Sequence, residues 1–84
     1  MFMPDQKTIQ EIILKTAAKR GIKKTTCPSE IARALFPADW RQHMGEVRTE
    51  VIALQKMGKV EITQGGKPVD IDSIKGPIRI QIVE

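Results

Sequence analysis

The stretch WRQHMGEVRTEVIALQKMGKVEITQ, residues 40–64, decides the fold of this chain. Its apolar residues recur at steps of three and four, and that spacing stacks them on one face of a helix. They are Trp40, Met44, Val47, Val51 and Leu54. Gly58 follows Met57 and ends the helix, because glycine readily adopts the left-handed backbone of a helix terminus. Residues 60–64 then alternate apolar and polar side chains, which predicts a β-strand directly after the helix.

A second alternating segment, IRIQI at residues 78–82, predicts another strand over about residues 77–83. The two strands are joined by residues 65–77, a Gly- and Pro-rich loop longer than the usual two to about five residues of a hairpin. A helix, a tight stop and a long-looped hairpin together predict a winged helix-turn-helix. This is an α+β fold of three helices and a small antiparallel sheet, in which residues 65–77 form the wing.

The sequence also predicts two further helices and a third strand. Residues 6–20 carry apolar side chains at helical spacing, with Asp5 placed to cap the start and Gly21 to end the helix. The third helix spans about residues 39–57. Residues 25–27 are rich in β-branched side chains and are a candidate third strand.

The second helix, over about residues 28–36, has a clear entry signal. Pro28 suits the first helical position, because its missing N–H would have no partner there. Cys27 is therefore the cap residue. Glu30 lies three residues later, where its carboxylate can accept a hydrogen bond from the Cys27 N–H, as in a capping box.

Composition and charge limit the classes of protein that the chain can represent. Its 84 residues fit one domain, and 40% hydrophobic with 29% charged residues indicates a folded globular protein. The single cysteine cannot form an internal disulfide, and no signal peptide or bilayer-spanning run is visible. We therefore expect a cytoplasmic protein without a membrane partner. The net charge of +4 is compatible with an anionic partner but does not require one.

Several separate motifs in unbroken order resemble a small bacterial winged-helix family that is catalogued only as a domain of unknown function. They are CPSEIARAL at 27–35, WR at 40–41 with Met44, VR at 47–48, QGGKPVD at 64–70 and KGPIR at 75–79. The resemblance implies the winged-helix fold. It suggests nucleic-acid binding by analogy only, because one fold can host many functions.

Basic and polar residues on the third helix and the wing are the candidate contacts to nucleic acid. In a winged helix on duplex DNA, the third helix enters the major groove and the wing touches the backbone or the minor groove. The candidates are Arg41, Gln42, Arg48, Thr49 and Lys56 on the helix, and Lys67, Lys75 and Arg79 on the wing and its returning strand. Gln42 and Thr49 can bond to base edges, whereas Lys and Arg add affinity by releasing counterions from phosphates. We hypothesise that the protein binds double-stranded DNA.

Charge on the helix flanks weighs against this hypothesis. Glu46 and Glu50 lie on the side opposite to the arginines and would repel phosphates there. Arg48 can equally form an intramolecular ion pair with Glu30 or with an acid of the wing. A denser basic cluster at residues 19–24 is more typical of a solvated helix end than of a binding site. Trp40 is expected in the core.

The sequence shows no recognisable set of catalytic residues. Cys27 at a helix start can be a reactive thiol, but a small cap residue fits it better, because His43 lies elsewhere in the chain and no base is evident. Zinc-ligand spacing, a phosphate-cradling Gly-Lys motif and a carboxylate pair are all missing from the sequence. We therefore expect neither catalysis nor a cofactor.

The alternative function is a protein–protein interaction module. The outer face of the third helix is small and nearly neutral at Gly45, Thr49 and Ala53, and this suits close packing against another chain. The strand over residues 78–83 can also leave an edge open for pairing with a second chain. Salt dependence separates the two functions, because phosphate binding weakens steeply with salt.

Overall fold

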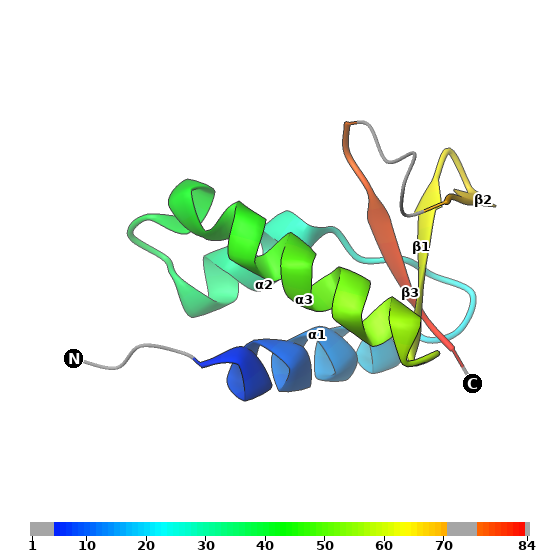
Figure 1. Cartoon of the computed structure of the whole chain (residues 1–84), viewed down its shortest axis with the longest axis horizontal. Coiled ribbons are helices and arrows are strands. Elements are labelled where there is room, and N and C mark those ends of the chain that lie inside the picture. The colour runs from blue at the N-terminus through cyan, green and yellow to red at the C-terminus, as the bar shows by residue number, and fades with distance from the viewer. Residues whose placement is uncertain (1–4, 71–75, 84) are drawn as a thin grey trace.

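Three helices and a three-stranded antiparallel sheet form the protein, as a computed structural model that describes residues 5–70 and 76–83 shows (Figure 1). The elements are α1 (Gln6–Arg20), α2 (Pro28–Leu35), the 3₁₀ turn η1 (Trp40–His43), α3 (Met44–Lys56), β1 (Val60–Gln64), β2 (Lys67–Pro68) and β3 (Arg79–Ile82). This α+β arrangement is consistent with a winged helix. The fold class predicted from the sequence is confirmed.

Helix α1 has the ends that the sequence predicts. The Asp5 side chain accepts a hydrogen bond from the Thr8 N–H over 2.8 Å, and the Gly21 N–H donates to two carbonyl groups of the last turn. The buried face of α1 consists of Ile9, Ile13 and Ala17. Both capping interactions are local, which is why the sequence suffices to place them.

Helix α2 begins at Pro28 after the cap residue Cys27, but the expected capping box is wrong. The Oε2 atom of Glu30 accepts hydrogen bonds from Arg20 over 2.5 Å and from the Thr26 hydroxyl over 3.0 Å, in place of a bond from the Cys27 N–H. Arg20 belongs to α1, so the Glu30 carboxylate ties two helices together. A long-range cationic partner has replaced the local one.

The helix expected over residues 39–57 is divided into η1 and α3, since His43 departs from helical geometry with φ −105° and ψ 4°. Trp40 opens η1 and packs against the core as expected, but it is only half-buried. The guanidinium groups of Arg33 and Arg41 lie over the indole ring, 4.4 Å and 4.9 Å from its centroid. The 3₁₀ turn thus places one part of the ring against the core and leaves the rest to cation–π contacts.

The strand order in the sheet is β2-β1-β3. Gln64 pairs with Lys67, so that Gly65 and Gly66 alone form the turn, with φ angles of 61° and 80°. Two consecutive positive φ angles define the tight type I′ hairpin, which glycine adopts without strain. The prediction of one uninterrupted loop over residues 65–77 is therefore wrong at its beginning.

The segment 25–27 does not form the expected strand. Only Thr26 pairs with β3, through two hydrogen bonds of 2.8 Å between its backbone and that of Ile80, because helix α2 starts two residues later. The neighbouring side chains of Arg79 and Gln81 donate to Thr25 and to the Ile22 carbonyl oxygen. The backbone of β3 is therefore paired within the chain at Ile80, and the expectation of an open edge is wrong at this position, although β3 is the last strand of the sheet.

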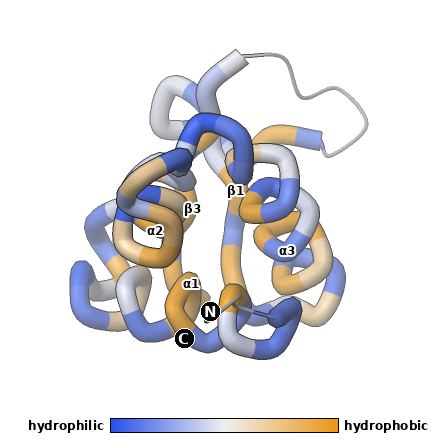
Figure 2. The backbone as a smooth tube through the Cα atoms, turned by 90° about the vertical axis from the view of Figure 1, so that its left-hand side faces the viewer, coloured by the Kyte–Doolittle hydropathy of each residue, from blue (hydrophilic) through white to orange (hydrophobic). Residues whose placement is uncertain are grey.

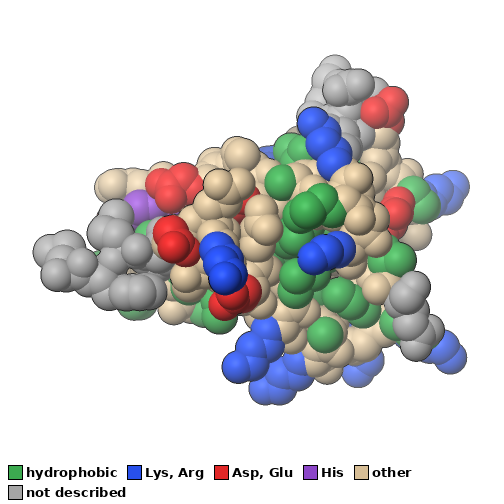
Figure 3. All heavy atoms as spheres, turned by 60° about the horizontal axis from the view of Figure 1, so that its bottom comes forward, with side chains coloured by type: hydrophobic (Ala, Val, Ile, Leu, Met, Phe, Trp, Pro, Cys, Tyr) green, Lys and Arg blue, Asp and Glu red, His purple; other side chains and the backbone are tan. Residues whose placement is uncertain are grey.

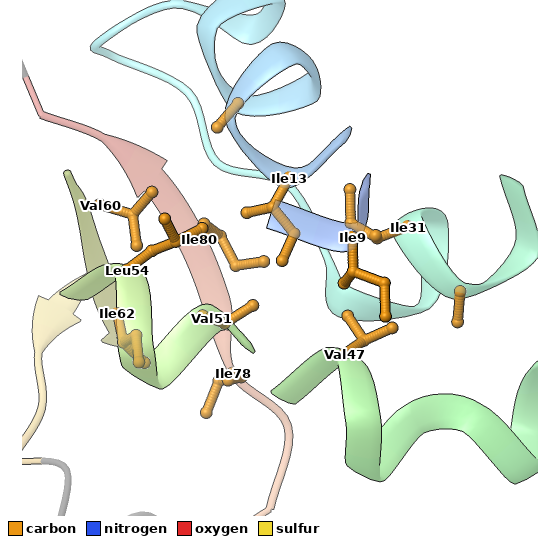
Figure 4. Packing of buried hydrophobic residues seen from close by; sticks show 12 residues of the cluster. Ile9, Ile13, Ile31, Val47, Val51, Leu54, Val60, Ile62, Ile78 and Ile80 are labelled. Carbon is orange, nitrogen blue, oxygen red and sulfur yellow. The ribbon is translucent and has the colours of Figure 1, made fainter. Parts of the chain in front are cut away.

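One hydrophobic core lies between the three helices and the sheet, as Figures 2 and 4 show. Val47, Val51 and Leu54 of α3 point into it and are fully buried. The strands contribute Val60, Ile62, Ile78 and Ile80, and α1 and α2 contribute Ile9, Ile13, Ala17, Ile31 and Ala32. The periodic stripe of α3 therefore faces the core, and its opposite face remains available to a partner.

Candidate nucleic-acid interface

Four of the predicted contact residues on η1 and α3 are exposed, namely Arg41, Gln42, Thr49 and Lys56. Arg41 and Gln42 lie on η1, and Lys56 lies in the last turn of α3. The Arg41 guanidinium stacks on Trp40, which holds the side chain in place while leaving its charge at the surface. Gly45 lies between these residues and has open space around its Cα, so a ligand backbone can approach closely there.

Glu50 lies on a flank of α3, as the helical wheel predicts, but it is buried there and is not exposed to a ligand. Only 9% of the residue is exposed, and Oε1 accepts a hydrogen bond of 2.8 Å from the Gln10 side chain of α1. The packing of α1 against α3 covers this flank. The helical spacing of Glu50 from the buried Val47 and Leu54, three and four residues away, is the signal in the sequence for this outcome, but it does not identify Gln10 as the partner.

Glu46 remains exposed and interacts with His43. The imidazole Nδ1 atom lies 2.9 Å from Glu46 Oε1, and Nε2 lies 3.2 Å from Asp39 Oδ2. Phe36 stacks on the ring, with centroids 3.7 Å apart and planes 8° from parallel. Burial alone would lower the pKa of His43, but the bonds to Glu46 and Asp39 outweigh it and raise this pKa above its ordinary value. A protonated ring partly offsets the two carboxylates.

Arg48 is engaged inside the protein. Its Nη2 atom donates to the Gly76 carbonyl oxygen over 3.3 Å, and the side chain lines a hollow of about 260 Å³ with Cys27, Met44 and Ile78. Glu30, one of the intramolecular partners considered for Arg48, binds Arg20 instead. Arg48 therefore links α3 to the segment that leads into β3.

Two further predicted contact residues use their polar atoms in intramolecular bonds. The Thr49 hydroxyl donates to the Gly45 carbonyl oxygen over 2.9 Å. Arg79 donates from Nε to Thr25 Oγ1 over 2.9 Å and from Nη2 to the Thr25 carbonyl oxygen over 3.3 Å. Their hydrogen-bonding capacity toward a base or a phosphate is correspondingly reduced.

The wing contributes one exposed cation among the described residues. Lys67 stands in β2 beside the glycine turn. Lys75 lies outside the described residues. The structure thus brings Arg41 and Gln42 together on η1 and places Lys67 on the separate β1–β2 hairpin.

Within residues 5–70 and 76–83, no group of three or more His, Cys, Asp or Glu side chains is arranged to hold a metal ion. None of the helices in these two ranges is both long and apolar enough to cross a membrane.

These features define a small α+β protein, consistent with a winged helix, that presents an exposed helical face beside a short hairpin. Residues 6–83 match the family described as "Protein of unknown function (DUF3253)", and the chain belongs to this family. No curated protein matches the chain.

Proposed function

We propose that the protein binds duplex DNA, with the outward face of η1 and α3 in the major groove and the β1–β2 hairpin against the backbone. The observation that carries this proposal is the position of Glu50. Its carboxylate is directed to Gln10 and away from the outward face, so one of the two acids that would repel phosphate there is removed. The other, Glu46, is partly offset by His43.

The exposed residues take distinct roles in this arrangement. Arg41 and Lys56 contact phosphates, and Lys67 does so from the hairpin. Gln42 bonds to a base edge, since its amide has both donors and an acceptor and no intramolecular side-chain bond within the described part of the chain. Arg48 and Arg79 act as positioning residues, because their guanidinium groups hold residues 76 and 25.

A titration of backbone amide NMR signals with a mixed-sequence duplex tests the proposal. We expect shifts at residues 41–49 and at Lys67, and we expect them to diminish between about 50 and 200 mM salt as counterions compete. Arg41→Ala should weaken binding by about tenfold and lower the salt dependence by about one ion.

Lys15→Ala is the matched control, because it removes the same charge from an exposed position on α1. It should leave the affinity close to that of the unmodified protein. If the duplex produces no shifts, or if Lys15→Ala weakens binding as much as Arg41→Ala does, the proposed interface is wrong.

A further inference from the structure

Three large hydrophobic side chains are exposed at the end of the molecule where α1 and α3 terminate. Ile22 follows α1 and is 46% exposed, Met57 follows α3 and is 53% exposed, and Val83 follows β3 and is 44% exposed. They are the exposed large hydrophobic residues of the described chain. Because each comes from a different segment, their grouping is a product of the tertiary fold.

Hydrogen bonds around the end of β3 bring these segments together. The Gln81 side chain donates to the Ile22 carbonyl oxygen on one side of the strand. On the other side, the Val83 N–H donates to the Lys59 carbonyl oxygen over 3.2 Å, two residues beyond Met57. The segments that carry the three exposed side chains therefore meet around the end of one strand.

Lysines flank this surface. Lys23 and Lys24 follow Ile22, and Lys59 is the residue that Val83 contacts. All three are exposed, and none forms an ion pair with an acid within residues 5–70 and 76–83. The nearest acid in the strand register is Glu61, opposite Gln81. Figure 3 shows hydrophobic side chains gathered on the α1 side of the molecule, with both basic and acidic side chains around them.

We propose that this lysine-flanked surface (Ile22, Lys23, Lys24, Met57, Lys59 and Val83) docks an acidic amphipathic segment of a partner protein. The apolar centre takes the hydrophobic face of such a segment, and the lysines face its carboxylates. A polyanion without apolar groups would leave the centre exposed to water. A second copy of this surface would bring the same lysines against one another.

The proposed surface adjoins the proposed DNA-binding face only where Lys56 precedes Met57 at the end of α3, and it does not depend on the other residues of that face. Arg41, Gln42 and Lys67 belong to η1 and β2, whereas the docking surface lies where α1, α3 and β3 end. Substitutions at different residues are therefore expected to abolish DNA binding and peptide docking, and separate titrations with duplex and with peptide measure the two.

The test is an NMR titration of the full chain with a synthetic peptide of about four helical turns, with leucines on one face and glutamates elsewhere. A second peptide replaces the leucines by serine at the same charge. We expect shifts at residues 22–24, 57–59 and 81–83 with the leucine peptide and much weaker binding of the serine peptide. The double variant Ile22→Gln, Met57→Gln should weaken peptide binding by at least about tenfold, because it removes two apolar side chains that the bound peptide would cover.

Two further variants make the result decisive. Lys23→Glu, Lys24→Glu should abolish the same shifts through charge, and Ala34→Gln, at an exposed position of α2, should leave them unchanged. The proposal is overturned if the leucine peptide causes no shifts at this surface, or if the serine peptide binds equally well. It is also overturned if vesicles of phosphatidylserine and phosphatidylcholine bind through Ile22 and Met57 and the peptide does not.

Discussion

Arg79 holds Thr25 against the edge of the sheet. Its Nε atom donates to Thr25 Oγ1 over 2.9 Å, and its Nη2 atom donates to the Thr25 carbonyl oxygen over 3.3 Å. The next residue in each segment continues the contact, since Thr26 and Ile80 exchange two backbone hydrogen bonds. An arginine that looks available to DNA from the sequence alone thus joins the start of α2 to β3.

Arg79→Ala should lower the free energy of unfolding by about 1 kcal/mol, because two exposed hydrogen bonds are lost. Its effect on DNA affinity should be smaller than that of Arg41→Ala. Urea denaturation and duplex titration of both variants measure the two effects. A variant that is fully stable but has lost DNA binding would contradict the positioning role.

Glu50→Ala should destabilise the protein by about 1–3 kcal/mol, because the partly buried Gln10 amide loses its acceptor. Glu50→Gln keeps an acceptor and should cost less. A double-mutant cycle with Gln10→Ala, measured by urea denaturation, isolates the pair. Additive single effects would show that the bond does not contribute to stability.

His43 should make stability depend on pH. Its pKa in the folded protein is raised above 6.5 by Glu46 and Asp39, so the folded state binds the proton more tightly than the unfolded chain does. The resulting stabilisation is complete below about pH 6.5 and is lost as the pH rises through the folded pKa. His43→Gln should lack this component. Melting curves across this pH range and an NMR titration of the imidazole check the direction, and a folded pKa below 6.5 would refute it.

Gly66→Ala should destabilise the protein by about 1–2 kcal/mol, because its φ of 80° belongs to the left-handed region that alanine avoids. Space is not the cause, since a Cβ at this position meets no atom within 4 Å. Thermal denaturation measures the effect.

Gly45→Ala is the matched control for the turn glycine. It has the same open space, but it lies in α3 without a positive φ, so it should leave stability unchanged or raise it by up to about 1 kcal/mol. Equal losses in Gly45→Ala and Gly66→Ala would contradict the backbone explanation.

The agreement between sequence and structure depends on the distance over which an interaction acts. The Asp5 cap, the Pro28 entry of α2 and the core stripe of α3 were all predictable, because each follows from residues a few positions apart. The exposed positions of Gln42 and Lys56 follow from the same periodicity.

Residues distant in the sequence determined the hydrogen-bond partners of Glu30 and Glu50, which the periodicity could not predict. Glu30 is placed to accept a hydrogen bond from the Cys27 N–H at the start of its own helix, yet its carboxylate binds Arg20 of α1. Glu50 lies on a polar flank of the helical wheel, yet Gln10 draws it into the contact between α1 and α3. The partner of Glu30 lies ten positions away in the sequence, and the partner of Glu50 lies forty positions away. A helical wheel contains no information about such neighbours.

The sequence by itself determined the order of the elements, the caps of α1 and the face of α3 that enters the core, because apolar spacing and capping act locally. Only the tertiary structure decided which charges remain at the surface. It engages Arg48, Arg79 and Glu50 within the chain, and it brings the segments that carry Ile22, Met57 and Val83 together around the end of β3. The physical reason is that a polar or apolar group acts on whatever lies beside it in space, and packing alone sets those neighbours.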